Sequence, residues 1–272
     1  MLKAGVVQLD IRFADVELNV AAACDGIDNL AGRGAEIILL PELWSCGFDN
    51  KNLLAHAKKT PAILEKLTKK AEKYNMIIAG SLPELSGPEL SGPELSGGKI
   101  YNTLYLINKN GDIAESYRKI HLFTPAGENN YFAPGNKEVV AKTSIGPVGL
   151  MTCYDLRFPE LCRSLTLQGA IIVLVSAEWP LERIEHWDIL LKARALENQL
   201  FIIAANICGQ DPTIVYGGCS QIVSPQGKVL AKAERKACLL DFEMNMNEIT
   251  EFRNQIPSLG TTQFEQIYIS GK

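Results

Sequence analysis

The stretch VGLMTCYDLRFPE, from Val148 to Glu160, joins an apolar run to a turn and a helix signal, with Cys153 at the junction. The apolar residues before the cysteine predict a buried strand. The free N–H groups at the start of a following helix carry partial positive charge, which favours a thiolate. Cys153 is therefore a candidate nucleophile, although a cysteine at a strand end is more often a small buried hydrophobe.

The composition is that of a globular protein with a sizeable core, in one large domain or two small ones. The chain has 272 residues, 47% of them hydrophobic and 21% charged. Its net charge is −4 and it contains no long Lys/Arg run, so no nucleic-acid partner is expected. The apolar runs 37–40, 171–175 and 201–205 are too short to span a membrane. The N-terminus lacks an apolar secretory core, and we expect a cytoplasmic protein without a membrane partner.

Cysteine and histidine usage argues against a disulfide framework and against a metal site. The cysteines are scattered and odd in number: Cys24, Cys46, Cys153, Cys162, Cys208, Cys219 and Cys238. No C-x-x-C pair occurs, which suits a reducing compartment. There are only three histidines and no H-E-x-x-H motif, so we expect no metal site.

Strand and helix signals alternate along the first eighty residues. Apolar runs at 3–9, 35–40 and 76–80 predict strands, and apolar spacing predicts helices over 16–30 and from Pro61 onward. This alternation predicts an α/β fold.

The same signals continue to about residue 242. We expect a hairpin over 99–122, a short helix over 159–168 and the most amphipathic helix over 182–198. Further strands are expected over 138–143, 148–152, 170–175, 201–207, 218–223, 228–233 and 238–242. Residues 243–272 are polar with isolated aromatics, and we expect a tail that packs on the body or on a partner subunit.

A tandem repeat interrupts this pattern. The pentapeptide PELSG begins at Pro83, Pro88 and Pro93. A segment so rich in Pro, Gly and Ser cannot form a packed core, so 83–98 is expected to be a protruding surface loop. Loops tolerate insertions at low cost, which favours an expanded loop over a binding motif.

Three side chains with reactive groups stand at or just beyond the ends of expected strands. Glu42 follows EIILLP, Lys119 follows ESYR and Cys153 follows VGLMT. In open α/β sheets, sites gather at the carboxyl ends of strands, so these three residues are expected to converge. Taken alone, Glu42 reads as a helix cap or surface charge and Lys119 as a solvated lysine.

The segments around these residues resemble the three signature motifs of the nitrilase superfamily of carbon–nitrogen hydrolases. The motifs are LLPELW at Glu42, YRKIHLF at Lys119 and CYDLRFPEL at Cys153. The likeness extends to AGENNYFAPG, SAEWP, KARALENQLFIIAAN and GGCSQIVSPQGKVL, and so covers the chain from the first strand to about Phe242. Within the family, the motifs are most similar to the amidase branch of omega-amidases and deaminated-glutathione amidases.

The resemblance implies a four-layer αββα sandwich in one domain, residues 1–272, and hydrolysis of a small carboxylic-acid amide through a thioester. Cys153 would attack the amide, and Glu42 would take up and return protons. Lys119 and the backbone N–H of Tyr154 would stabilise the oxyanion. Glu128 matches a second glutamate of the family, which orients the lysine or assists the base; the alternative is a structural loop carboxylate.

Two further residues are candidates for substrate binding. Arg157 would grip a substrate carboxylate with its bidentate fork. Pairing with Asp155 or Glu160 as scaffolding is the alternative, and the sequence slightly favours it. Trp179 would line the acyl pocket, or else belong to the core.

The resemblance implies no cofactor and a homodimer or higher homo-oligomer built on the helices near the nucleophile. An N-carbamoyl amino-acid hydrolase is disfavoured because Leu156 stands where that group carries the first of two arginines. A nitrilase acting on nitriles is disfavoured by the residues after Cys153. Two alternatives of other classes remain: a papain-like hydrolase with His121 as base, and a non-catalytic binding or scaffold protein.

Overall fold

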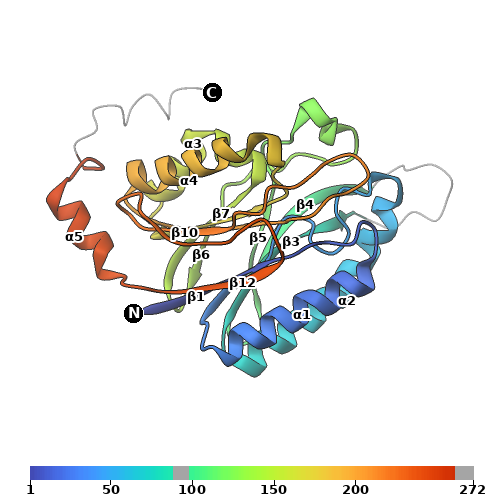
Figure 1. Cartoon of the computed structure of the whole chain (residues 1–272), viewed down its shortest axis with the longest axis horizontal. Helices are drawn as coiled ribbons and strands as arrows, with labels where there is room; N and C mark the ends of the chain where they lie inside the picture. Colours follow the sequence, from blue (N-terminus) through green and yellow to red (C-terminus); the bar gives the residue numbers. More distant parts are fainter. Residues whose placement is uncertain (88–97, 261–272) are drawn as a thin grey trace.

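Two six-stranded sheets lie face to face between two pairs of helices in the computed structural model, which describes residues 1–87 and 98–260 (Figure 1). Helices α1 (Val16–Gly32) and α2 (Leu53–Tyr74) cover the outer face of one sheet. Helices α3 (Pro159–Leu167) and α4 (Ile184–Asn198) cover the other sheet. The expected four-layer αββα sandwich is confirmed.

Each sheet has three parallel strands at its centre and antiparallel strands outside them. The first sheet has the order β12-β1-β2-β3-β4-β5. Its strands are β1 (Leu2–Gln8), β2 (Ile37–Leu39), β3 (Ile77–Ser86), β4 (Lys99–Ile107), β5 (Ile113–Arg118) and β12 (Cys238–Met244). The second sheet has the order β11-β10-β9-β8-β7-β6. Its strands are β6 (Val140–Thr143), β7 (Gly146–Thr152), β8 (Ile172–Ala177), β9 (Phe201–Asn206), β10 (Gln221–Val223) and β11 (Val229–Lys232).

The strands of the first sheet contribute to two cores, because consecutive strand residues point to opposite faces. In β2, Ile37 and Leu39 pack between the sheets, whereas Ile38 packs on the side of α1 and α2. A Cβ at Gly26 of α1 would lie 2.8 Å from Val7 Cγ1 of β1. Glycine therefore lets α1 lie close against the sheet.

The strand ends carry the candidate residues toward one another. Cys153 directly follows β7, and Lys119 directly follows β5. Glu42 lies in the loop after β2, and Glu178 directly follows β8. This placement is the one expected from strands that end at a common edge.

Helix α2 begins eight residues earlier than predicted, and Pro61 lies inside it. Proline usually favours the first turn of a helix, which made Pro61 look like the start. The turns before Pro61 bury Leu53 and Ala57, and Thr60 Oγ1 donates a hydrogen bond to Pro83 O at 2.6 Å. This packing outweighs the hydrogen bond that the proline removes.

The first PELSG copy belongs to a strand and not to a loop. Strand β3 pairs with β4 up to Ser86 and Lys99, and it includes Pro83 and Glu84. The Glu84 carboxylate binds Arg118 of β5 at 2.6 and 2.9 Å, and this ion pair ties the end of β3 to the sheet. The expected loop therefore begins after Ser86, and 88–97 lies outside the described residues.

Helix α4 is not the strongly amphipathic helix that the sequence predicted. Its side chains Ile189 and Leu196 are exposed, whereas Arg194 and Asn198 are buried. The following segment, α5 (Asn247–Gln255), buries Phe252 and packs on the end of α4. Residues 261–272 of the expected tail lie outside the described residues. None of the helices in the described part of the chain is long and apolar enough to cross a membrane.

Candidate active site

Cys153 begins a short 3₁₀ turn, η4 (Cys153–Arg157), immediately after β7. Its φ of +46° lies in the left-handed region, which a non-glycine residue adopts only when its surroundings hold it there. The buried Asp155 carboxylate holds the turn, because its Oδ2 accepts hydrogen bonds from Thr152 N at 2.9 Å and Tyr117 Oη at 2.7 Å. The turn thus fixes the position of the Cys153 thiol.

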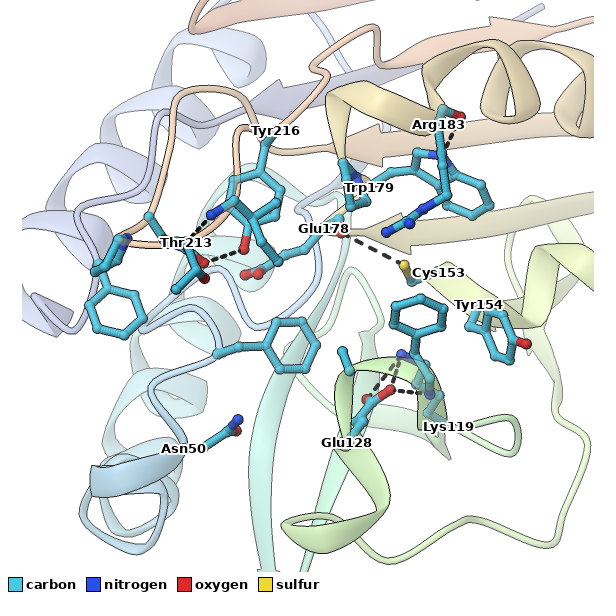
Figure 2. Close-up of a pocket in the computed structure, with 18 of the residues that line it drawn as sticks. Asn50, Lys119, Glu128, Cys153, Tyr154, Glu178, Trp179, Arg183, Thr213 and Tyr216 are labelled. Atoms are coloured by element: carbon cyan, nitrogen blue, oxygen red, sulfur yellow. Dashed lines mark hydrogen bonds and ion pairs between the residues drawn. The ribbon is translucent and has the colours of Figure 1, made fainter.

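A cavity of about 310 Å³ opens in front of Cys153 (Figure 2). Its walls come from segments that are far apart in the sequence, and its volume suits a small ligand. The lining side chains include Phe48, Lys119, Phe123, Glu128, Tyr154, Arg157, Glu178, Trp179, Arg183 and Tyr216.

Glu42 is fully buried behind this wall, with both carboxylate oxygens hydrogen-bonded. Its Oε1 accepts from Lys119 Nζ at 2.9 Å and Asn102 Nδ2 at 2.7 Å, and its Oε2 accepts from Glu178 N at 2.9 Å. Burial raises the pKa of Glu42, and the charge of Glu128 adds to this rise while Lys119 opposes it. A raised pKa suits a carboxylate that exchanges protons near neutral pH.

Lys119 lies between two buried carboxylates. Its Nζ binds Glu42 Oε1 at 2.9 Å and the two oxygens of Glu128 at 3.0 and 2.8 Å. Burial alone would lower the pKa of Lys119, but Glu42 and Glu128 outweigh it and raise the pKa well above 10.5. The ammonium group is therefore a fixed positive charge on the cavity wall.

Glu128 is held at the start of the turn η3 (Glu128–Asn130). Its Oε2 accepts from Phe123 N at 2.6 Å, and its Oε1 accepts from Asn102 Nδ2 at 3.3 Å. Asn102 of β4 thus bridges Glu128 and Glu42. These bonds fix both carboxylates around Lys119.

The surroundings of Cys153 favour the protonated thiol, whereas the helix signal in the sequence favours the thiolate. Burial raises its pKa well above 9.0, the negative charge of Glu42 adds to this, and Lys119 opposes it. The turn after Cys153 is only a short 3₁₀ segment, so the partial charge at its start is too small to reverse the effect of burial. The Sγ lies 3.9 Å from Glu178 O.

Arg157 lines the cavity and has no ion pair with Asp155 or Glu160 in the part of the chain that the structure describes. The pairing expected with Asp155 or Glu160 is therefore not formed, and Arg157 Nη2 lies 3.3 Å from His186 Nδ1. Asp155 binds the turn and His121 instead. The Arg157 guanidinium lies over the Trp179 ring, 4.8 Å from its centroid. Burial and the nearby Arg183 charge lower the pKa of Arg157.

Trp179 and Tyr154 both line the cavity near Cys153 (Figure 2). Trp179 is nearly buried, and its Nε1 donates to Arg183 O at 2.8 Å. The Trp179 ring therefore lines the cavity and also belongs to the hydrophobic core. The predicted role of the Tyr154 backbone N–H stays a prediction.

The contacts of His121 do not suit the general base of a papain-like site. Its Nδ1 lies 2.8 Å from Asp155 Oδ1, and its ring stacks on Phe158 with centroids 3.7 Å apart. It is not among the residues that line the cavity. Within the described residues, no group of three or more His, Cys, Asp or Glu side chains is arranged to hold a metal ion.

The carbon–nitrogen hydrolase family model matches residues 3–254. The chain belongs to the carbon–nitrogen hydrolase family. It is 35% identical to a 2-oxoglutaramate amidase of Bacillus subtilis over 92% of this chain and 93% of that protein. It is also 31% identical to human omega-amidase NIT2, over 94% of this chain and 92% of that protein.

Solved structures of this family have the same fold. Saccharomyces cerevisiae Nit3, a nitrilase-superfamily member, matches with a TM-score of 0.86 and 26% identity, over 97% of this chain and 96% of that chain. A glutamate-to-glutamine mutant of a Nesterenkonia amidase matches with a TM-score of 0.80 and 28% identity, over 96% and 97% of the two chains. In that mutant, the acetamide moiety of fluoroacetamide is bound covalently to the active-site cysteine.

Two residues of this carbon–nitrogen hydrolase site were missed from the sequence, Asn102 and Glu178. Glu178 directly follows an apolar strand, which is the signal that also singles out Glu42, but within SAEWP the sequence analysis singles out only Trp179. Asn102 lies within a hairpin strand, where a polar residue looks like part of a solvent-facing side. Its burial depends on packing that the local pattern does not reveal.

Proposed function

We propose that this protein hydrolyses the terminal amide of a small carboxylic acid to a carboxylate and ammonia, through a thioester on Cys153. The observation that carries the proposal is the placement of Lys119 and Cys153 on one small cavity, with Glu42 bonded to that lysine. The covalent cysteine adduct in a related amidase supports the same chemistry.

Acylation begins when the Cys153 sulfur attacks the amide carbon and its proton passes to Glu42. The carbonyl oxygen becomes an oxyanion, which Lys119 Nζ and the backbone N–H of Tyr154 stabilise. When the oxyanion collapses, the carbon–nitrogen bond breaks and Glu42 returns the proton to the nitrogen. Ammonia leaves, and the acyl group stays on Cys153.

Deacylation reverses the roles of these groups. Glu42 takes a proton from water, and the oxygen attacks the thioester carbon. The carbon–sulfur bond then breaks and the thiolate regains the proton from Glu42. In both halves, Lys119 keeps its charge because its two carboxylate neighbours hold its pKa high.

The cavity supports a substrate that carries a carboxylate. Arg157 has no carboxylate partner among the described residues, and Arg183 lines the same cavity. An arginine can grip a carboxylate with two parallel hydrogen bonds. The named substrates of the relatives, 2-oxoglutaramate and omega-amides, are consistent with this class.

The carbamoyl alternative is less well supported. Leu156 is fully buried in the core and offers no charge to the cavity. Only one arginine of the CYDLRFPEL motif therefore lies at the site.

We also infer a homodimer in a reducing compartment, the cytoplasm. All of the cysteines are free thiols, as a reducing environment requires. Large apolar side chains are exposed on α3 and α4, namely Leu167, Ile189 and Leu196. Exposed apolar side chains on neighbouring helices are typical of a subunit interface.

Ammonia release from matched dicarboxylate monoamides, N-carbamoyl amino acids and nitriles tests the function. We expect release from the monoamides, and a loss of about 1,000-fold or more in Cys153→Ala. Arg157→Met should raise KM for monoamides more than for butyramide, which has no carboxylate. Ammonia from nitriles but not from amides would contradict the proposal.

Chemical labelling separates this proposal from a non-catalytic protein. Iodoacetamide should modify Cys153 before the other cysteines, and a monoamide substrate should protect it. Labelling spread evenly over the cysteines, with no protection, would favour a binding or scaffold protein.

A further inference from the structure

Glu178 is a buried carboxyl group in the wall of the cavity. Only 4% of the residue is exposed, and neither Oε1 nor Oε2 has a partner among the described residues. Native proteins keep few such groups, because a buried polar atom without a partner costs free energy. The side chain lines the cavity in front of Cys153, where a ligand can supply the missing bonds (Figure 2).

The main chain of Glu178 is fixed beside the reacting groups. Its N–H donates to Glu42 Oε2 at 2.9 Å, and its carbonyl oxygen lies 3.9 Å from Cys153 Sγ. The next residue is held as well, since Trp179 N donates to Asn206 Oδ1 at 2.6 Å. From this anchor the side chain extends along the cavity toward Tyr216 (Figure 2).

The neighbouring hydroxyl group of Tyr216 does not use its proton for Glu178. Tyr216 Oη donates to Asp211 Oδ2 at 2.7 Å. Asp211 is also bound by the backbone N–H groups of Thr213 and Ile214, at 2.6 and 2.7 Å. The Asp211 carboxylate and the Tyr216 proton are therefore already used in hydrogen bonds within this loop.

The surroundings of Glu178 favour the protonated form of its carboxyl group. Burial raises its pKa well above 4.5, and the negative charge of Glu42 adds to the rise, while the nearby Tyr216 hydroxyl opposes it. A neutral carboxyl group has an O–H donor as well as an acceptor oxygen. It can therefore donate to an uncharged oxygen, which a carboxylate cannot.

We propose that Glu178 is a specificity-determining residue that hydrogen-bonds an uncharged oxygen, a carbonyl or a hydroxyl, on the acyl chain of the amide substrate. This inference rests on the proposed amidase function and narrows its substrate class to oxo- and hydroxy-substituted monoamides. An ammonium substituent is disfavoured, because it would share the cavity with the guanidinium groups of Arg157 and Arg183.

The test compares kcat/KM for glutaric acid monoamide and its 2-oxo, 2-hydroxy and 2-amino derivatives. The wild-type protein should prefer the oxo and hydroxy compounds to the unsubstituted amide by about 10-fold or more. Glu178→Leu should abolish this preference, because kcat/KM should fall more for the oxo and hydroxy compounds than for the unsubstituted amide. Glu178→Gln should keep most of the preference, because its amide group also donates a hydrogen bond.

Stability provides the folding control. Glu178→Leu removes an unpaired buried polar group, so its thermal unfolding midpoint should equal or exceed that of the wild type. Glu251→Leu, a carboxylate-to-leucine change on the exposed side of α5, should alter none of the substrate preferences.

Three results would overturn the proposal. An equal loss of kcat/KM for all four amides in Glu178→Leu would mean that Glu178 acts through Glu42 and does not bind substrate. A preference for the 2-amino compound that Glu178→Gln abolishes would mean that a carboxylate binds a cation. Wild-type turnover without any preference would leave the amidase function standing and refute the role of Glu178. Ammonia from none of the four amides would contradict the amidase function itself.

Discussion

At the scale of single residues, the geometry around Lys119 leads us to propose that Glu128 is a positioning residue. The lysine is held by Glu128 as well as by Glu42, and Glu128 is itself fixed by Phe123 N. Without Glu128, the ammonium group would keep only the carboxylate of Glu42 to hold it toward the substrate oxygen.

Glu128→Gln should therefore lower kcat by about 10- to 100-fold and change KM little, because the lysine loses one of its charged partners. Steady-state ammonia release measures this effect. Glu160→Gln, at an exposed position of α3, is the matched control and should behave as the wild type. A large rise in KM with unchanged kcat would show that Glu128 binds substrate.

The pH profile should reflect Glu42 and not a histidine. Burial raises the pKa of Glu42 above 4.5, so kcat/KM should fall on the acid side at a higher pH than an ordinary glutamate would give. Lys119 stays charged on the alkaline side because its pKa is raised well above 10.5. Measuring kcat/KM against pH for wild type and His121→Asn checks this, and an acid limb lost in the variant would support His121 as base.

The residue positions differ in how far the sequence could predict them. Glu42, Lys119 and Cys153 each follow a strand and carry a recognisable motif, so their convergence could be foreseen. Asn102 and Glu178 show their importance only through burial, which depends on how the two sheets and the loops pack. The raised pKa of Cys153 could not be foreseen, because burial of the thiol is not visible in the sequence.

At the scale of elements, the start of α2 and the end of β3 were not predicted, because both depend on contacts with distant parts of the chain. Leu53 lies in a small core with Leu43, Leu122 and Phe132, which come from other parts of the chain. Because of this long-range packing, α2 begins at Leu53, before the proline at which the local signal places its start. The parallel strands and the hairpin were predictable, because their apolar runs and turn residues are local.

The ion pair between Glu84 and Arg118 should stabilise the end of β3 at neutral pH. Burial opposes ionisation of Glu84, but bonds from Arg118 and Thr103 outweigh it and lower the Glu84 pKa below 4.5. The stabilisation is therefore present above pH 4.5 and is lost as the pH falls through the lowered pKa.

Glu84→Gln should reduce the free energy of unfolding by about 1 kcal/mol at pH 7, a partly exposed pair being worth no more than this. Urea unfolding at several pH values measures the difference between variant and wild type. The difference should vanish in acid, and a difference that persists at low pH would mean that the charge of Glu84 is not its cause.

At the scale of the whole molecule, the outer face of α3 and α4 is the expected dimer interface. Ile189 and Leu196 are 61% and 49% exposed, and Leu167 is 55% exposed. Ile189→Glu with Leu196→Glu should shift sedimentation from dimer to monomer, because charges would be buried in an apolar contact. The matched pair Leu18→Glu and Leu54→Glu, on α1 and α2, should not. A wild-type protein that sediments as a monomer would contradict this prediction.

The central claim is that the amide is cleaved through a thioester on Cys153, and hydroxylamine tests it most directly. Hydroxylamine competes with water for a thioester and converts the acyl group to a hydroxamate. Wild-type protein turning over glutaric acid monoamide should form the hydroxamate at the expense of the carboxylate, and Cys153→Ala should form neither. Ammonia release without any hydroxamate, or an equal yield of hydroxamate from Cys153→Ala, would contradict the account.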